Sequence, residues 1–104
     1  MLFMRRKGIV MKQKPVVRRR ISFYGQVQAV GFRYQAMRAA DMYGASGWVR
    51  NEYDGSVTME IQGTERQIDS VVAYICNSMY IQVDRMETKS LPVIFEDHGF
   101  RVKY

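Results

Sequence analysis

The chain has 104 residues, of which 47% are apolar and 25% charged, a composition that fits one small globular domain and excludes wholesale disorder. A single cysteine and a single histidine exclude a disulfide framework and a zinc ligand set, so no metal is expected. The formal net charge is +6, but the first 20 residues hold eight basic and no acidic side chains. Residues 21–104 carry the other eight basic side chains against all ten acidic ones, a net charge of −2.

The basicity therefore belongs to the N-terminal segment. We expect residues 1–17 to form a flexible, solvated basic tail and residues 18–104 to form the folded domain. No run approaches the roughly 18 apolar residues of a membrane-spanning helix, and the first residues lack the apolar segment of a secretory signal. The sequence predicts a cytoplasmic protein without membrane insertion.

The first elements in chain order are a strand and a helix. Apolar side chains alternate with polar ones from residue 19 to residue 27, the period of a strand with one face on a core. Alanines then recur at spacings of three and four over residues 32–43, and Gly44 follows. This pattern predicts a helix with a glycine stop whose small face packs closely on a sheet.

A hairpin and a second helix come next. Runs at residues 46–51 and 56–62 flank Asp54-Gly55, a strong turn signal, and predict two strands joined by a hairpin. Thr64 and Gln67 have the capping-box spacing that starts a helix. The apolar positions that follow predict an amphipathic helix; these positions are Ile68, Val71, Val72, Ile75 and Met79. We expect Cys76, within this helix, to be a small apolar residue that fills space in the core.

Two extended segments close the chain. Residues 83–90 alternate poorly, which indicates an edge strand or a bulge, whereas residues 100–104 alternate well. The order strand, helix, strand, strand, helix, strand, with a short terminal strand, predicts an α+β fold. We expect a ferredoxin-like βαββαβ sandwich, with one antiparallel sheet and both helices on one of its faces.

The most informative segment for chemistry is Gly25–Arg33. A strand runs into a loop of small residues and then into a helix, an arrangement that can direct several backbone N–H groups at one oxyanion near the positive end of the helix dipole. Arg33 lies in the first helical turn, where that dipole disfavours a cation unless an anion binds there. An ordinary turn followed by a solvent-facing arginine explains the segment equally well.

A second candidate is Asn51, at the predicted end of a strand just before the hairpin turn. Its amide can accept from and donate to one water molecule, and a strand end is a rigid place from which to aim it. The alternative is an Asx turn that opens the hairpin. Trp48, on the same strand, is expected to pack in the core or on the sheet face.

These segments resemble the acylphosphatase family. Gly25–Arg33 is similar to its signature G-x-V-Q-G-V-x-F-R, and Gly47–Gly63 is similar to its second signature, G-aromatic-x-x-N-x-x-x-G-x-V with a later glycine. The likeness spans residues 18–104 and implies the same two-helix sandwich. It implies a phosphate-binding Arg33, a water-orienting Asn51 and a phosphate cradle formed by Gln28, Ala29, Val30, Gly31 and Phe32.

The activity that this resemblance implies is hydrolysis of a small-molecule acyl phosphate to a carboxylate and inorganic phosphate, without a metal or an organic cofactor. One position departs from the signature, because Ala29 stands where the family has glycine. A positive φ at this position would cost on the order of 1 kcal/mol and disturb the cradle, whereas a negative φ would make the alanine harmless.

Two other classes of function fit parts of the sequence. One is a non-catalytic module that only binds an anion in the same loop. The other is an RNA-binding domain, since the same fold hosts RNA-recognition motifs, but Phe32 enters a helix and no pair of stacking aromatic residues accompanies it. We therefore expect no specific nucleic-acid partner, and we expect a monomer because no coiled-coil pattern is present.

Overall fold

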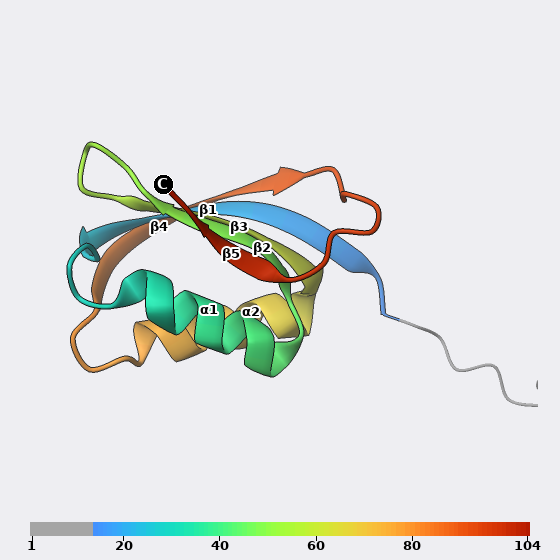
Figure 1. Ribbon diagram of the computed structural model, residues 1–104, viewed down its shortest axis with the longest axis horizontal. Helices are drawn as coiled ribbons and strands as arrows, with labels where there is room; N and C mark the ends of the chain where they lie inside the picture. The colour runs from blue at the N-terminus through green and yellow to red at the C-terminus, as the bar shows by residue number, and fades with distance from the viewer. Residues whose placement is uncertain (1–13) are drawn as a thin grey trace, which may run out of the picture.

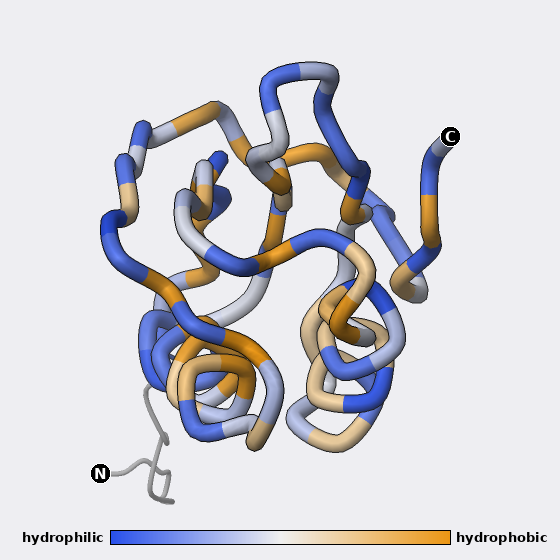
Figure 2. The backbone as a smooth tube through the Cα atoms, turned by 90° about the vertical axis from the view of Figure 1, so that its left-hand side faces the viewer, coloured by the Kyte–Doolittle hydropathy of each residue, from blue (hydrophilic) through white to orange (hydrophobic). Residues whose placement is uncertain are grey.

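The computed structural model describes residues 14–104 and contains two helices on one face of a five-stranded sheet (Figure 1). Seen almost end-on in Figure 2, both helices lie on the same side of the strands. The predicted ferredoxin-like α+β fold is confirmed. The elements are β1 (Val16–Gln26), α1 (Phe32–Tyr43), β2 (Ser46–Asn51), β3 (Val57–Thr64), α2 (Glu65–Cys76), β4 (Gln82–Leu91) and β5 (Phe100–Lys103). Within this part of the chain, neither helix is long and apolar enough to cross a membrane.

The strand order is β4-β1-β3-β2-β5. All pairings are antiparallel except that of β5, which runs parallel to β2, so the sheet is mixed where a wholly antiparallel one was expected. Residues 92–99 carry the chain from one edge of the sheet to the other, and side-chain alternation within β5 contains no information about that crossing. β4 lies at an edge, and its pairing with β1 shifts register between Tyr24 and Gly25, which confirms both expectations for this segment.

The folded region begins earlier than expected. β1 starts at Val16, which pairs with Thr64, and Val17 pairs with Gly63. Two residues of the predicted tail are therefore part of the sheet. Lys14 and Pro15 lie before the strand and are exposed, and the rest of that prediction falls on residues 1–13, which lie outside the described residues.

The core lies between the sheet and the two helices. Ala36, Ala39 and Ala40 are fully buried, so α1 packs closely on the strands as predicted. The rings of Phe23 on β1 and Phe32 on α1 meet edge to face with centroids 4.8 Å apart, which fixes the start of α1 against the sheet.

Helix α2 starts as predicted but ends sooner. The Thr64 hydroxyl accepts from the Gln67 N–H and the Gln67 side chain accepts from the Thr64 N–H, which confirms the capping box. The helix stops at Cys76, because the N–H of Ser78 turns back to the carbonyl of Ile75 and tightens the last turn. Met79 is therefore 85% exposed and outside the helix, and Cys76 is exposed; the predictions of a helical Met79 and a filler Cys76 are wrong.

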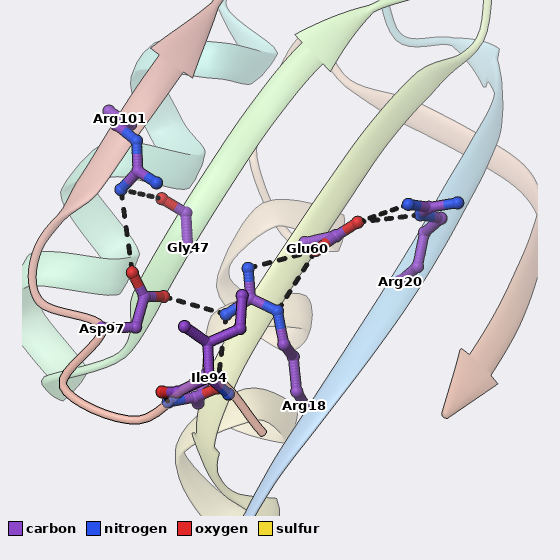
Figure 3. A network of polar contacts seen from close by, with 8 residues as sticks. Arg18, Arg20, Gly47, Glu60, Ile94, Asp97 and Arg101 are labelled. Atoms are coloured by element: carbon purple, nitrogen blue, oxygen red, sulfur yellow. Dashed lines mark hydrogen bonds and ion pairs between the residues drawn. The ribbon is translucent and has the colours of Figure 1, made fainter. Parts of the chain in front are cut away.

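The sheet face opposite the helices carries a buried ionic network (Figure 3). Arg18, which the sequence places in the basic N-terminal run, is only 2% exposed. Its guanidinium donates to Glu60 Oε1 on β3 through Nε and Nη2, both at 3.1 Å, and to Asp97 Oδ2 at 2.8 Å. Asp97 belongs to residues 92–99, so the network holds that connection against the sheet. The connection thereby leads the chain to the edge where β5 pairs with β2.

The two carboxylates of this network are held ionised. Burial alone would raise the pKa of Glu60, but hydrogen bonds from Arg20 and Arg18 outweigh it and the pKa lies below its usual value. The pKa of Asp97 is likewise lowered, because bonds from Arg18 and Ser46 and the charges of Arg18 and Arg101 outweigh its burial. Each carboxylate therefore stabilises the fold in its charged form.

Trp48 on β2 packs on the same sheet face, in agreement with the expectation for this residue. It is 6% exposed, and cations cover its ring, with the Arg50 guanidinium 5.1 Å and the Lys103 ammonium 4.4 Å from the centroid. These contacts leave little of the indole available to stack on a ligand.

Candidate active site

The loop between β1 and α1 has the backbone of an anion-binding concavity. Ala29 has φ 61° and Gly31 has φ 83°, and left-handed residues alternating with others can turn successive N–H groups toward one side. Gly31 is also the N-cap of α1. The structure thus selects the positive φ at Ala29, at a cost of about 1 kcal/mol for a residue with a Cβ.

We expect Ala29→Gly to stabilise the protein by about 0.5–1 kcal/mol, because the relief of the left-handed strain exceeds the added entropy of the unfolded chain. Ala73→Gly, at an exposed position inside α2, is the matched control and should destabilise by about 1 kcal/mol. Chemical denaturation of both variants measures these values. A loss of stability in Ala29→Gly equal to that in Ala73→Gly would show that the loop is not strained.

The N-terminus of α1 differs from that of α2 in a way that favours an anion. Helix α2 has a capping box and Glu65 in its first turn, so its N–H groups and dipole are already compensated. Helix α1 has no side-chain cap and no acidic residue in its first turn. The N–H groups of Phe32, Arg33 and Tyr34 precede the first intrahelical bond, which runs from Gln35 to Gly31 at 3.0 Å.

Arg33 and Asn51 line the same cleft, which has a volume of about 310 Å³ and also includes Ala29 and Gly31 of the loop. Arg33 comes from the first turn of α1 and Asn51 is the last residue of β2. Within residues 14–104, no carboxylate lies at ion-pairing distance from the Arg33 guanidinium. The centroid of the Tyr104 ring lies 5.3 Å from the guanidinium carbon. Because no described carboxylate pairs with Arg33, the charge of Arg33 is available to an anionic ligand.

The hairpin turn after Asn51 is built by another residue. Asp54 Oδ1 accepts from both the N–H and the hydroxyl of Ser56. These hydrogen bonds lower the pKa of Asp54, and they form the Asx turn that was the alternative role for Asn51. The side chain of Asn51 makes none of the hydrogen bonds found within residues 14–104, which leaves its amide available to the cleft.

Gln28 is absent from the lining of the cleft, and its side chain contacts the hairpin. Its amide nitrogen donates to the carbonyl of Glu52 at 2.7 Å and to that of Ser56 at 2.9 Å. It therefore ties the loop to the hairpin that carries Asn51. Val30 is also absent from the lining and packs against the core, and the Phe32 ring is buried although Phe32 belongs to the lining.

We expect Gln28→Ala to destabilise the protein by about 0.5–1.5 kcal/mol, because it removes one donor from each of two partly buried carbonyl groups, which keep only their backbone donors. The kcat for the reaction proposed below should fall about tenfold, since the hairpin is no longer held against the loop. Gln26→Ala, at an exposed position nearby, is the control and should change neither value. Thermal unfolding and initial rates measure both effects, and normal kinetics in Gln28→Ala would contradict the positioning role.

Several lining residues were not predicted from the sequence. They are Val27, Tyr34, Met37, Val102 and Tyr104. Met37 follows Arg33 by four residues and so shares its helix face, a signal that could have revealed it. Val102 and Tyr104 reach the cleft only because β5 pairs with β2, so no local pattern could have found them.

Another hollow, of about 720 Å³, lies between the start of β1 and the N-terminal half of α2. It is larger than the cleft but offers poor chemistry for an anion. Its two basic lining residues, Lys14 and Arg66, are balanced by Glu65 and Asp69, and the capping box of Thr64 and Gln67 already occupies the adjoining helix end. We therefore place the candidate site at the smaller cleft.

The fold and the cleft together define a ferredoxin-like domain with a cation and a backbone cradle at the start of its first helix. Residues 19–102 match the acylphosphatase family. The chain is 40% identical over 87 residues to an acylphosphatase from Oceanobacillus iheyensis, which covers 82% of this chain and 96% of that protein. It is 40% identical over 82 residues to an acylphosphatase from Pediococcus pentosaceus, over 77% of this chain and 90% of that one.

A solved structure agrees with these relatives. The crystal structure of acylphosphatase from Bacillus subtilis superposes with a TM-score of 0.78 at 32% identity, over 85% of this chain and 99% of that one. The chain therefore belongs to the acylphosphatase family.

Proposed function

We propose that this chain hydrolyses small-molecule acyl phosphates to a carboxylate and inorganic phosphate, without a metal ion or an organic cofactor. The observation that carries the proposal is the meeting of Arg33, Asn51 and the left-handed loop at one cleft beside an uncapped helix N-terminus. The names of the matched relatives favour this activity over a module that only binds an anion.

In the proposed reaction, the phosphoryl group occupies the cradle. The Arg33 guanidinium and the N–H groups at the start of α1 stabilise charge on its non-bridging oxygens. Asn51 holds a water molecule whose oxygen attacks phosphorus, and the bond from phosphorus to the acyl oxygen breaks. The carboxylate leaves with the bonding electrons, and the displaced proton of the water passes to phosphate or solvent.

The leaving group explains why so few side chains suffice. A carboxylic acid has a pKa of roughly 4, so its anion departs without a general acid. An alkoxide is far more basic and would need protonation. The same site should therefore cleave acyl phosphates and leave alkyl phosphate monoesters intact.

The experiment that tests this proposal follows phosphate release from benzoyl phosphate, acetyl phosphate and an alkyl phosphate monoester, each with and without a chelator. We expect turnover of both acyl phosphates, unchanged by the chelator, and none of the monoester. Binding of inorganic phosphate without turnover would instead identify an anion-binding module. Rapid cleavage of the monoester, or loss of activity on chelation, would contradict the mechanism.

Asn51→Ala should lower kcat about 10²-fold or more, as for the loss of one preorganised polar group. The binding of inorganic phosphate should change little, because Arg33 and the cradle remain. Steady-state kinetics and phosphate inhibition separate these quantities. A normal kcat in this variant would place the attacking water elsewhere.

The sequence also predicts a monomeric, cytoplasmic protein without a specific nucleic-acid partner. These three points stay predictions. The oligomeric state can be measured by sedimentation of the full chain.

A further inference from the structure

The connection between β4 and β5 is held against the sheet by side chains that do not line the cleft. Asp97, whose side chain is 9% exposed, accepts from the Arg18 guanidinium on β1 at 2.8 Å. The Gln62 amide on β3 donates to the carbonyl of Ile94 at 2.8 Å and accepts from the N–H of Ile94 at 2.9 Å. Arg18 also donates to Gln62 Oε1 at 3.3 Å, so the two pairs form one network, which we call the latch (Figure 3).

Strand β5 is short and lies at the edge of the sheet. It has four residues and pairs with β2 alone, in the parallel arrangement that is slightly less stable per residue. The strand begins at Phe100, three residues after Asp97. Between them, the carbonyl of Gly99 accepts from the N–H of Gly47 on β2 at 3.0 Å. Because so few residues separate the latch from the strand, the position of Asp97 determines where β5 begins along β2.

Strand β5 brings an aromatic ring to the cation of the cleft. Val102 of this strand and Tyr104, which follows it, line the cleft. The guanidinium carbon of Arg33 lies 5.3 Å from the centroid of the Tyr104 ring, within the range of a cation–π contact. Within residues 14–104 no carboxylate pairs with this guanidinium, so the ring is the observed contact that orients it. A displacement of β5 along β2 would carry the ring away from Arg33.

A buried ion pair is suited to hold one arrangement of the chain. The side chains of Arg18 and Asp97 are 2% and 9% exposed, and burial of two charges removes hydration that their attraction only partly restores. Apolar side chains of similar volume often give equal or greater stability. A charged pair adds direction, because its hydrogen bonds form only when both partners keep their geometry. The latch therefore fixes the position of the connection more sharply than apolar packing would.

We propose that Arg18 and Asp97 are positioning residues for the active site: by fixing where β5 begins, they hold the Tyr104 ring against Arg33 and so orient its guanidinium for the phosphoryl group. This inference rests on the proposed function, because it concerns the same reaction. Neither Arg18 nor Asp97 lines the cleft, so both act through β5. The latch thus links the sheet face opposite the helices to the site at the start of α1.

Asp97→Asn tests the proposal, because it removes the negative charge of the latch at nearly constant shape. We expect the Kd of inorganic phosphate, measured by titration calorimetry, to rise at least threefold, and kcat/KM for benzoyl phosphate to fall at least tenfold. Asp41→Asn, at an exposed position on α1, is the matched control and should change neither value. A fall in kcat with unchanged Kd and KM would show only a smaller folded fraction and would overturn the positioning role.

A double variant tests the route through β5. Tyr104→Leu removes the ring and should also raise the Kd of phosphate at least threefold. Adding Asp97→Asn to Tyr104→Leu should raise that Kd less than twofold further, because both substitutions affect the same contact. Independent effects, which would multiply in the double variant, would overturn the route.

Gln62→Leu keeps the test valid if Asp97→Asn does not fold. It releases Ile94 and leaves the pair of Arg18 and Asp97 intact, so the Kd of phosphate should rise at least twofold. An unchanged Kd in this folded variant would overturn the role of the latch. Calorimetry does not require turnover, so absence of hydrolysis in the wild type, with the expected changes in Kd, would refute the proposed function and leave the positioning of Arg33 intact.

Discussion

Arg33→Ala should reduce hydrolysis of acyl phosphates to the uncatalysed rate, a loss of at least about 10³-fold in kcat/KM. Arg33 is the one cation among the described residues of the cleft, and backbone N–H groups alone supply only part of the charge that the transferring phosphoryl group needs. Inorganic phosphate should also cease to inhibit competitively. Initial rates with benzoyl phosphate and phosphate inhibition measure the two losses.

The fold should survive this substitution, because Arg33 makes no ion pair within residues 14–104. Arg38→Ala is the matched control: Arg38 lies on the same helix, is exposed, and is absent from the lining of the cleft. It should keep near-normal kinetics. Turnover in Arg33→Ala within tenfold of the wild type would move the active site away from this cleft.

Arg18→Met should destabilise the protein by about 3–5 kcal/mol, because it removes the shared cation of two buried carboxylates and leaves Asp97, among the described residues, with only the longer ionic contact to Arg101, at 3.9 Å. That loss is a large part of the 5–15 kcal/mol that typically holds a domain together. Arg19→Ala is the control, since Arg19 pairs with the exposed Glu65 and its loss should cost less than about 1 kcal/mol. Urea denaturation at pH 7 measures both values.

The pH dependence distinguishes loss of the ion pairs from loss of packing. Folded-state pKa values of Glu60 and Asp97 are lowered, so their stabilisation is present above their unfolded pKa values of about 4 and is lost as the pH falls through the lower folded values. In Arg18→Met, protonation of Asp97 neutralises a buried charge that has lost its closest partner. The gap in unfolding free energy between wild type and variant should therefore narrow below about pH 4. A gap independent of pH would assign the effect to packing.

The limits of α1 show how much local sequence can determine. The predicted helix and the observed one coincide at Phe32–Tyr43, because Gly31 and Gly44 both adopt the left-handed conformation that bounds it. The capping box at the start of α2 is equally local. The end of α2 was missed, because the apolar spacing continues to Met79 although the backbone turns at Asn77.

Arg18 shows what local sequence leaves open. It stands in a run of basic residues, which is typical of a solvated segment, yet it is among the most buried charged side chains described. Its partners come from β3 and from the connection before β5. Burial of a charge depends on partners distant in the chain, so composition alone could not predict that this residue is buried.

The candidate site likewise combines features that follow from local sequence with features that depend on the tertiary structure. The residue types in Gly25–Arg33 and around Asn51 predicted, through their resemblance to the family signatures, which side chains could act on a phosphoryl group, because the loop and the strand end are made by neighbouring residues. Only the tertiary structure decided that Ala29 has a positive φ, that the Gln28 amide donates to the hairpin, and that β5 brings Val102 and Tyr104 to the cleft. These features depend on the pairing of strands far apart in the chain, and the energy of such pairing is not contained in any short segment.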